Sequence, residues 1–381
     1  MPKKVCILGA TGSIGRNCLS VIESLGGKFA VRSLAARKNV EGLLEAAHRC
    51  GADRICLAGG EVTDSVTPDA LEGLEVCRGS RALEELAADR DVDIVVNALV
   101  GGAGLGPSLA ALGAGKRLAL ANKESMVMAG PHLIELAAKE PGAEIIPVDS
   151  EHSALFQLIR DKKDSALSKV IITASGGPFR GYDRTRLEQV SFSDSQRHPT
   201  WNMGPKITVD SATLANKGLE VIEAHFLFGV EYNNIEVLVH PQSIVHAMAV
   251  FHDGAVLAHL GVADMRIPIQ YALTWPERLR SEVPAPDFAE LGGLAFEPVN
   301  RDNFPCLDLA YEAGRQAGVA TAVYNAANEI AVERFMAGQI GFTRIPDTIE
   351  KSLAGAPKMS GPSLEEIFEA DNWARGFASK L

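Results

Sequence analysis

Short apolar runs alternate with helical patterns through the first third of the chain. The expected strands cover residues 5–8, 30–35, 54–57, 92–98 and 117–121. The expected helices between them cover residues 17–25, 40–50, 80–88 and 109–114. Repeated strand–helix units predict an α/β fold with a parallel, doubly wound sheet of the Rossmann type. Ligands of such sheets bind beyond the carboxyl ends of the strands.

The pattern changes after residue 150. A helical pattern at 154–160 and a strand at 170–174 precede a long polar stretch without periodicity, which is typical of a lid or a binding loop. Strands expected at 235–239, 244–251 and 255–260 predict an α+β region with a mostly antiparallel sheet. An open sheet of this kind is a candidate dimer surface.

These changes, and a length of 381 residues, predict several domains. We expect a Rossmann-like dinucleotide-binding domain at 1–149 and a catalytic domain at 150–275, which would bind substrate and metal and form the dimer. A linker rich in proline and glycine is expected at 276–300. Helical patterns then predict a C-terminal α-helical domain at 301–381.

Composition narrows the classes of function. Hydrophobic residues make up 46% and charged residues 22% of the chain, which are globular values. A formal net charge of -11 argues against nucleic acid or an anionic membrane as the main partner. The six cysteines are scattered without a C-x-x-C pair, which favours reduced thiols over disulfides or a zinc site. No apolar run has membrane-spanning length, and Met1–Lys4 lead directly into a strand, so we expect a cytoplasmic protein without a targeting segment.

A glycine-rich turn, Gly9-Ala10-Thr11-Gly12-Ser13-Ile14-Gly15, follows the first strand and precedes a helix. Glycines let the backbone approach a pyrophosphate, and the helix N-terminus offers unpaired amides, so the turn predicts a dinucleotide cofactor. After the second strand the chain has Arg37-Lys38-Asn39 where an acidic residue would meet an unphosphorylated ribose. This favours NADP(H) over NAD(H), and a solvated basic turn is the alternative.

Asn122-Lys123-Glu124 follows the strand at 117–121. At the carboxyl end of a strand, Lys123 could meet an anionic or polarised substrate oxygen, with Asn122 and Glu124 near the nicotinamide. An ordinary solvated turn is an equally good interpretation of the three residues alone.

Two carboxylates follow the apolar run 145–148, which is expected to be a buried strand. Asp149 and Glu151 are two residues apart, and alternate side chains of extended backbone point the same way, so both could bind one hard cation. The alternative is an acidic helix start with Asp149 or Ser150 as N-cap.

A third carboxylate, Glu220, lies in the run Asp210–Glu220. If this run is helical from Ser211, then Asn216, Lys217 and Glu220 share one face. Three carboxylates with water and substrate oxygens suit Mg²⁺ or Mn²⁺ better than zinc. A surface ion pair between Lys217 and Glu220 is the alternative. Gly218, within the expected helix, argues mildly against a purely structural role because glycine weakens helices.

Several residues of the middle region suit a phosphate monoester. The turn Ser175-Gly176-Gly177 follows a strand and offers a hydroxyl and free amides. Ser211, Asn216 and Lys217 add polar donors, and His198 in the long loop could reach a phosphate or hydroxyl. Trp201 and Met203 suit an apolar cover over a substrate, with packing between domains as the alternative.

Taken together, these motifs resemble the 1-deoxy-D-xylulose 5-phosphate reductoisomerase family. The likeness runs in order along essentially the whole chain, and the middle motifs are highly specific. The segments that carry it are 9–15, 121–125, 147–152, 174–179, 198–204, 216–220, 240–243 and 326–332.

The resemblance implies an oxidoreductase and isomerase that converts 1-deoxy-D-xylulose 5-phosphate and NADPH into 2-C-methyl-D-erythritol 4-phosphate, in the non-mevalonate route to isoprenoids. It implies a homodimer, a flexible loop near 198–204 and a divalent cation, Mg²⁺ or Mn²⁺, with Co²⁺ as a further option. The implied metal ligands are Asp149, Glu151 and Glu220, which with Lys123 and His198 form the implied catalytic set. The implied substrate-binding residues are Lys123, Ser150, Glu151, Ser175, His198, Trp201, Ser211, Asn216, Lys217 and Glu220. The implied cofactor-binding residues are Gly9, Thr11, Gly12, Ser13, Ile14, Arg37, Lys38, Asn39, Asn122, Glu124 and Gly204.

The chain departs from the family pattern at Ala10, Arg37 and Thr200. Only Arg37, where glycine is commoner, bears on function, because a side chain beside the 2'-phosphate can alter cofactor affinity.

Two other functions are compatible with the Rossmann start. One is another NADP-dependent dehydrogenase, such as a homoserine or aspartate-semialdehyde dehydrogenase. Semialdehyde chemistry needs a nucleophilic cysteine, and Cys306, the only cysteine after residue 77, has no matching context. The other is a non-catalytic NADP(H)-binding redox sensor, which gives no reason for three carboxylates and a phosphate pocket.

Overall fold

The computed structural model describes residues 1–59, 71–159, 166–197, 201 and 203–381. The chain forms two compact units. Unit 1 consists of Met1–Ser125, Pro131–Ser153 and Asp264–Pro284. Unit 2 consists of Met126–Gly130, Ala154–Ala263 and Ala285–Leu381.

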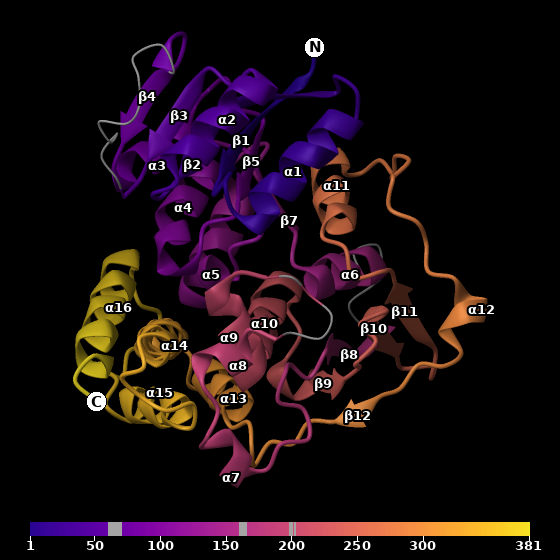
Figure 1. Ribbon diagram of the computed structural model, residues 1–381, viewed down its shortest axis with the longest axis vertical. Coiled ribbons are helices and arrows are strands. Elements are labelled where there is room, and N and C mark those ends of the chain that lie inside the picture. Colours follow the sequence, from indigo (N-terminus) through magenta and orange to yellow (C-terminus); the bar gives the residue numbers. More distant parts are fainter. Residues whose placement is uncertain (60–70, 160–165, 198–200, 202) are drawn as a thin grey trace. The chain divides into compact units, whose positions relative to one another are not determined.

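Unit 1 is built on a parallel sheet (Figure 1). Its described strands are β1 (Lys3–Leu8), β2 (Phe29–Ala36), β3 (Arg54–Leu57), β4 (Glu75–Arg78), β5 (Ile94–Asn97), β6 (Arg117–Leu120) and β7 (Glu144–Pro147). Its helical segments are α1 (Ser13–Ser24), α2 (Val40–Cys50), α3 (Ser80–Ala87), η2 (Gly101–Gly104), α4 (Leu105–Gly113), α5 (Lys123–Lys139, apart from Met126–Gly130) and α11 (Arg266–Thr274).

The strand order is β4-β3-β2-β1-β5-β6-β7, and the pairs run parallel. The chain therefore winds outward from β1 in one direction through β2 and in the other through β5. Residues Val5 to Leu8 of β1 are completely buried between these neighbours. The Rossmann-type, doubly wound sheet expected from the sequence is confirmed. In such sheets the ligand site lies where the strand order reverses, here at the carboxyl ends of β1 and β5.

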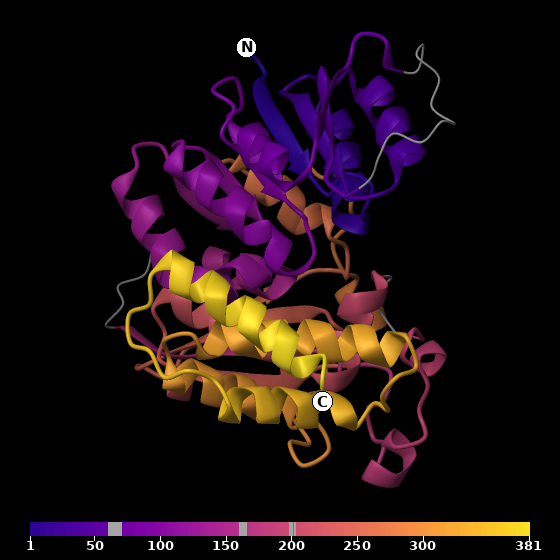
Figure 2. The ribbon, with the colours of Figure 1, turned by 90° about the vertical axis from the view of Figure 1, so that its left-hand side faces the viewer.

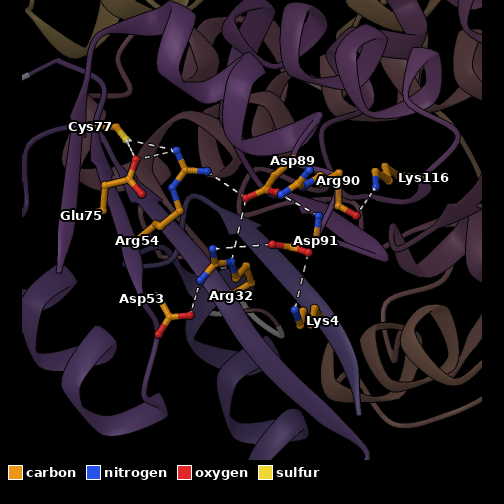
Figure 3. Close-up of polar contacts among 10 residues, drawn as sticks. All are labelled: Lys4, Arg32, Asp53, Arg54, Glu75, Cys77, Asp89, Arg90, Asp91 and Lys116. Atoms are coloured by element: carbon orange, nitrogen blue, oxygen red, sulfur yellow. Dashed lines mark hydrogen bonds and ion pairs between the residues drawn. The ribbon is translucent and has the colours of Figure 1, made fainter. Parts of the chain in front are cut away.

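A group of paired charges lies toward the amino ends of β3 and β4 (Figure 3). Arg54 donates to Glu75 and to Asp89, each over 2.8 Å. Arg32 pairs with Asp53 and approaches Asp89 within 4.0 Å. Because these charges neutralise one another, away from the carboxyl ends of the strands, we interpret the cluster as structural. The pairs with the exposed partners Asp53 and Glu75 each contribute little to stability.

Several elements of unit 1 were not expected from the sequence, among them β4, α5 and α11. Strand β4 is at the sheet edge and carries polar residues, so it lacks an apolar run. Helix α5 starts directly after β6, at residues whose chemistry suggested a loop. Helix α11 lies where only connecting segments were expected, and it packs against α1. The domain boundaries predicted at residues 149 and 275 stay predictions. Helix α11, which precedes residue 275, belongs to the same compact unit as the parallel sheet.

Unit 2 contains a mixed sheet. Its described strands are β8 (Leu167–Ala174), β9 (Ile235–Val239), β10 (Val245–Phe251), β11 (Val256–Leu260) and β12 (Glu297–Pro298). The order is β11-β10-β8-β9-β12, with β8 and β9 parallel and the other neighbours antiparallel. The mostly antiparallel second sheet is confirmed. β12 lies inside the segment expected to be a linker.

The helices of unit 2 include α6 (Ser150–Ile159, whose first turn belongs to unit 1), α7 (Arg184–Leu187), α8 (Phe192–Ser195), α9 (Pro205–Thr213), α10 (Ala215–Phe228), η4 (Tyr232–Asn234), α12 (Phe288–Leu291), α13 (Cys306–Gln316), α14 (Ala320–Met336), α15 (Arg344–Ala354) and α16 (Leu364–Ala378). The helix expected from Ser211 is in fact two helices. Leu214 separates α9 from α10 in a left-handed conformation, with φ of 61°.

The C-terminal helices form a bundle around α14, which packs against α13, α15 and α16 (Figure 2). Helix α14 is rich in alanine and buried over most of its surface, so its neighbours can approach from several sides. The same hydrophobic core includes Val170 of β8 and Ala247 of β10. The boundary at 300/301 therefore remains a prediction, although the helical character of the C-terminal region is confirmed. Among the described residues, no helix is both long enough and apolar enough to cross a lipid bilayer.

Candidate active site

The turn after β1 has the features that a dinucleotide pyrophosphate requires. Gly9 has φ of +90°, and a Cβ there would lie 2.4 Å from the Ala98 carbonyl oxygen. A Cβ on Gly15 would lie 2.4 Å from the Gly9 carbonyl oxygen. Gly12 is the N-cap of α1 and makes no side-chain cap, so the exposed first turn of the helix can offer its amides to an anion. The turn therefore fits the predicted cofactor.

The residues expected at the adenosine ribose directly follow β2. Arg37, Lys38 and Asn39 are all exposed. The Asn39 side chain caps α2 by accepting a hydrogen bond from the Gly42 amide over 3.0 Å. Gly59 donates its amide to the Arg37 carbonyl over 3.0 Å, and a Cβ on Gly59 would come within 2.9 Å of the Arg37 side chain. The two cationic side chains thus remain exposed at the carboxyl end of β2, where a 2'-phosphate is expected.

The triplet at the end of β6 forms the start of α5. Asn122 is the N-cap and accepts a hydrogen bond from the Ser125 amide over 3.1 Å. Its side-chain amide donates to a Glu124 carboxylate oxygen over 3.0 Å. Lys123 is 5% exposed and its ammonium group pairs with Asp149. The three residues are buried in an ordered helix start, which excludes the ordinary solvated turn.

Asp149 follows β7 at the start of α6. One of its carboxylate oxygens accepts the hydrogen bond of the Glu151 amide over 3.3 Å and lies 3.4 Å from His152 Nδ1. Asp149 is therefore a helix cap, as the alternative interpretation required, and it also pairs with Lys123. The hydroxyl of Ser150 donates to a Glu151 carboxylate oxygen over 2.6 Å. Two acidic side chains and a buried histidine thus lie at the carboxyl end of β7.

In unit 2, the turn after β8 lies against the end of α9. Gly176 and Gly177 have φ of +87° and +66°, and the Gly177 amide donates to the Ser175 hydroxyl over 3.2 Å. A Cβ on Gly177 would lie 2.8 Å from the Ser211 carbonyl oxygen. The structure therefore brings the Ser175 turn and the Ser211 segment into contact. Gly204, an expected cofactor residue, caps the other end of α9.

Helix α10 presents the third predicted carboxylate. Both Asn216 and Lys217 donate hydrogen bonds to Glu220, which is 1% exposed. The three residues share one helix face, as expected, although the helix starts after Leu214 and not at Ser211. Since Lys217 is only 4% exposed, the alternative of a surface ion pair is wrong.

The structure explains why residue 218 is a glycine, which the sequence alone did not. A Cβ there would lie 2.6 Å from Ala310 Cβ and 2.7 Å from the Tyr324 hydroxyl oxygen. The glycine is therefore explained by the close approach of α10 to α13 and α14, so the mild argument against a structural role was wrong.

A histidine that the sequence analysis did not single out lies beside the predicted lid tryptophan. The His246 and Trp201 rings have centroids 6.3 Å apart. Burial, followed by the positive charges of nearby His259 and Lys217, lowers the pKa of His246 to about 4. The imidazole is therefore neutral near pH 7 and adds no charge beside Lys217. His198 lies outside the described residues.

The cysteines are free thiols. Burial raises the pKa of Cys306 to about 12. A thiol with such a pKa cannot act as the nucleophile that semialdehyde chemistry needs.

Comparison with known proteins gives the family. A model described as 1-deoxy-D-xylulose 5-phosphate reductoisomerase matches residues 5–130, and its C-terminal domain model matches residues 145–228. A third model, DXP reductoisomerase C-terminal domain, matches residues 260–377. The chain belongs to the 1-deoxy-D-xylulose 5-phosphate reductoisomerase family.

Relatives match this reductoisomerase family member over its full length. The 1-deoxy-D-xylulose 5-phosphate reductoisomerase of Desulforamulus reducens is 47% identical, covering 100% of this chain and 99% of the relative. That of Pelotomaculum thermopropionicum is also 47% identical, with 100% and 98% covered. The solved reductoisomerase of Zymomonas mobilis in complex with NADPH is 41% identical, with a TM-score of 0.91 and 100% and 99% covered. A solved reductoisomerase in complex with NADPH, fosmidomycin and magnesium is 38% identical, with a TM-score of 0.92 and 99% and 98% covered.

The predicted site residues of this reductoisomerase family member fall in both units. Unit 1 contains the cofactor turn, Arg37 to Asn39, Asn122 to Glu124 and Asp149 to Glu151, and unit 2 contains the other predicted residues that the structure describes. Within unit 1 the structure joins Lys123 to Asp149, and within unit 2 it joins Lys217 to Glu220. The convergence of Asp149, Glu151 and Glu220 on one ion stays a prediction.

Proposed function

We propose that this chain converts 1-deoxy-D-xylulose 5-phosphate into 2-C-methyl-D-erythritol 4-phosphate, using NADPH and a divalent cation. The observation that carries the proposal is 47% identity along the whole length of a named reductoisomerase. The arrangement within unit 1 agrees with this chemistry, because the dinucleotide turn and the partly buried carboxylates of Asp149 and Glu151 lie at the carboxyl end of one sheet. The other dehydrogenase and the redox sensor are therefore set aside.

The cofactor would be held by unit 1. The turn Gly9 to Ile14 would receive the pyrophosphate on exposed amides, and Arg37 and Lys38 would face the 2'-phosphate. Asn39 holds the start of α2, and Asn122 and Glu124 lie at the start of α5. Gly204, the N-cap of α9, would be a further cofactor residue. When bound, NADPH supplies the hydride for the reduction.

Asp149, Glu151 and Glu220 would be the ligands of Mg²⁺, Mn²⁺ or Co²⁺. The cation supplies Lewis-acid polarisation of the ketone and the neighbouring hydroxyl, which the rearrangement of the carbon skeleton requires. Lys123 holds the Asp149 carboxylate in place and, in turn, can donate to a substrate oxygen. Asn216 and Lys217 orient Glu220 in the same way from one helix face.

The phosphate group of the substrate would bind to unit 2. Ser175 and Ser211 lie on segments that contact each other, and Asn216 and Lys217 add two donors. His198 would reach the same phosphate, while Trp201 would cover the substrate and exclude water. Ser150 adds a hydroxyl beside Glu151. Phosphate binding, remote from the reacting carbons, can stabilise the closed state in which the reaction proceeds.

We further propose a cytoplasmic homodimer with domains at 1–149, 150–275 and 301–381. Strand β11 has a free edge in the sheet order, and its Val256 and Leu257 are 52% and 41% exposed. A second copy that covers this edge would remove the exposed apolar surface. Light scattering of the purified protein tests the dimer, and a monomer at micromolar concentration would contradict it.

The test of the proposed function is NADPH oxidation by the purified protein with Mn²⁺, with and without the sugar phosphate. We expect oxidation only when the substrate is present. Glu151→Gln should abolish isomerisation and reduction together, because both need the polarised oxygens. Wild-type rates in that variant would refute the assignment of Glu151, and no oxidation by the unaltered protein would refute the function.

A further inference from the structure

Four polar side chains are completely buried beneath the turn that connects β5 to α4. Asn97 ends β5, Ser108 lies on α4, and Asn122 and Ser125 lie at the start of α5. The other residues of β5 are apolar. Buried polar groups are costly unless they are satisfied, so a group of four in one place requires a reason.

The Asn97 side chain fixes both ends of the turn. Its carboxamide nitrogen donates to the Gly104 carbonyl over 2.9 Å and to the Ser108 hydroxyl over 2.8 Å. Its carboxamide oxygen accepts the hydrogen bond of the Leu99 amide over 3.2 Å. One side chain therefore ties the first and last residues of Leu99–Gly104 to the end of β5.

The Asn122 side chain holds the first half of the same turn. Its nitrogen donates to the carbonyls of Leu99 and Gly101, each over 2.9 Å. A Cβ on Gly104 would lie 2.1 Å from Asn122 Oδ1, so only glycine permits this close approach.

Ser108 and Ser125 join the two asparagines. The Ser108 hydroxyl donates to the Ser125 hydroxyl over 3.3 Å, and the Ser125 hydroxyl donates to Asn122 Oδ1. The turn after β5 and the first turn of α5 are thus parts of one hydrogen-bonded network. A shift of either one must break hydrogen bonds that are shielded from water.

The network lies where the strand order reverses. The Ala98 amide donates to the Leu8 carbonyl over 2.9 Å, and the cofactor turn at Gly9 contacts the Ala98 carbonyl. A dinucleotide that crosses the sheet at this point must pass beside Leu99–Gly104. The first turn of α5 carries Lys123, which pairs with Asp149.

We propose that Asn97 and Ser108 are positioning residues for NADPH. They hold the turn Leu99–Gly104 and the first turn of α5 in one preformed arrangement, so that cofactor binding does not have to order either segment. Preformed sites bind more tightly because less conformational entropy is lost on binding. The inference rests on the proposed function in that it takes NADPH as the cofactor.

The test compares Asn97→Leu, Ser108→Ala and the control Ser33→Ala. Leucine is close to asparagine in size and removes its three hydrogen bonds, while Ser108→Ala breaks the network at one point. Ser33 is also completely buried in this sheet but lies on β2, outside the network. The dissociation constant of NADPH is measured by cofactor fluorescence without substrate, well below the melting temperature, alongside thermal unfolding and steady-state kinetics.

We expect the NADPH dissociation constant to rise about tenfold in Asn97→Leu and about threefold in Ser108→Ala, and to stay unchanged in Ser33→Ala. The KM for NADPH should follow these constants. A melting temperature that falls with no change in NADPH affinity would show a purely structural role and overturn the proposal. If Asn97→Leu does not fold, Ser108→Ala decides by the same criterion. Wild-type protein that binds NADPH but does not turn over the sugar phosphate would refute the proposed function only, since the affinities of the variants still test the positioning role.

Discussion

The ammonium group of Lys123 forms an ion pair with the carboxylate of Asp149. Their side chains are 6% and 11% exposed. Lys123 follows β6 and Asp149 follows β7, and these adjacent parallel strands end at the same edge of the sheet. The carboxylate that we propose as a metal ligand thus has a fixed cation beside it, and Lys123 and a divalent ion must share its charge.

This sharing predicts opposite effects of one substitution on metal binding and on turnover. Lys123→Met removes the competing cation, so Mn²⁺ should bind roughly three- to tenfold more tightly. The rate constant kcat should fall by about 100-fold or more, because the donor to the substrate oxygen is lost. Isothermal titration with Mn²⁺ and steady-state kinetics measure the two effects. Lys139→Met, on the exposed end of the same helix, is the control that should change neither. Weaker Mn²⁺ binding in Lys123→Met would contradict the shared carboxylate.

Arg37 provides a second prediction, on cofactor selectivity. Arg37 is exposed and directly follows β2, at the position where the family resemblance implies glycine as the commoner residue. Arg37→Gly should raise the dissociation constant of NADPH about three- to tenfold and leave that of NADH unchanged, because only NADPH offers a phosphate to the guanidinium. Fluorescence titration with both cofactors measures this. Arg49→Ala, which removes an exposed arginine of α2, is the control and should change neither dissociation constant. If Arg37→Gly instead weakened the binding of NADPH and NADH equally, the cause would be a change of the backbone and not a lost phosphate contact.

The sequence predicts the fold best where the signals are local. Helix α2 and strand β3 have the predicted bounds. The N-cap residue Asn39 marks the start of α2, and an apolar run marks β3. Strand β4 was missed because a polar edge strand has no such pattern. The break at Leu214 could not be predicted, since a left-handed residue is usually glycine, and only tertiary packing holds a leucine in that conformation.

The sequence predicted which residue types form the candidate site, but not all the hydrogen bonds that hold them in place. Residue type and spacing placed Lys217 and Glu220 on one face, because helical periodicity is local. Nothing in the residue pattern indicated that Asn97 and Ser108 would support the turn Leu99–Gly104 and the start of α5. Those hydrogen bonds depend on how β5, α4 and α5 pack. His152 could have been noticed, because it lies three residues after Asp149 on a helix.

The packing of Gly218 gives a third prediction. In most helices, replacing an internal glycine by alanine stabilises the protein. Gly218→Ala should instead lower the free energy of unfolding by roughly 1–3 kcal/mol, because the new methyl group would overlap Ala310 and Tyr324. Gly376→Ala is the matched control, since Gly376 lies within α16 and a methyl group added there would meet nothing within 4 Å, so it should be neutral or stabilising. Thermal and denaturant unfolding measure both, and a stabilised Gly218→Ala would show that α10 can move away from its neighbours.

His246 makes the stability of the fold depend on pH. Burial, and then His259 and Lys217, lower the pKa of His246 from its ordinary value of 6.5 to about 4. Between these two values the unfolded chain binds a proton that the folded chain does not, so stability rises with pH through this range. The neutral histidine therefore contributes its full stabilisation above pH 6.5, and roughly 3 kcal/mol of it should be lost as the pH falls to 4. The test compares melting temperatures at pH 7 and pH 4.5. The glutamine of His246→Gln cannot be protonated in this range, so the melting temperature of this variant should fall less than that of the wild type. His252→Gln, at an exposed position, is the control and should follow the wild type. Parallel pH profiles for His246→Gln and the wild type would mean that His246 is protonated at the same pH in the folded and unfolded states.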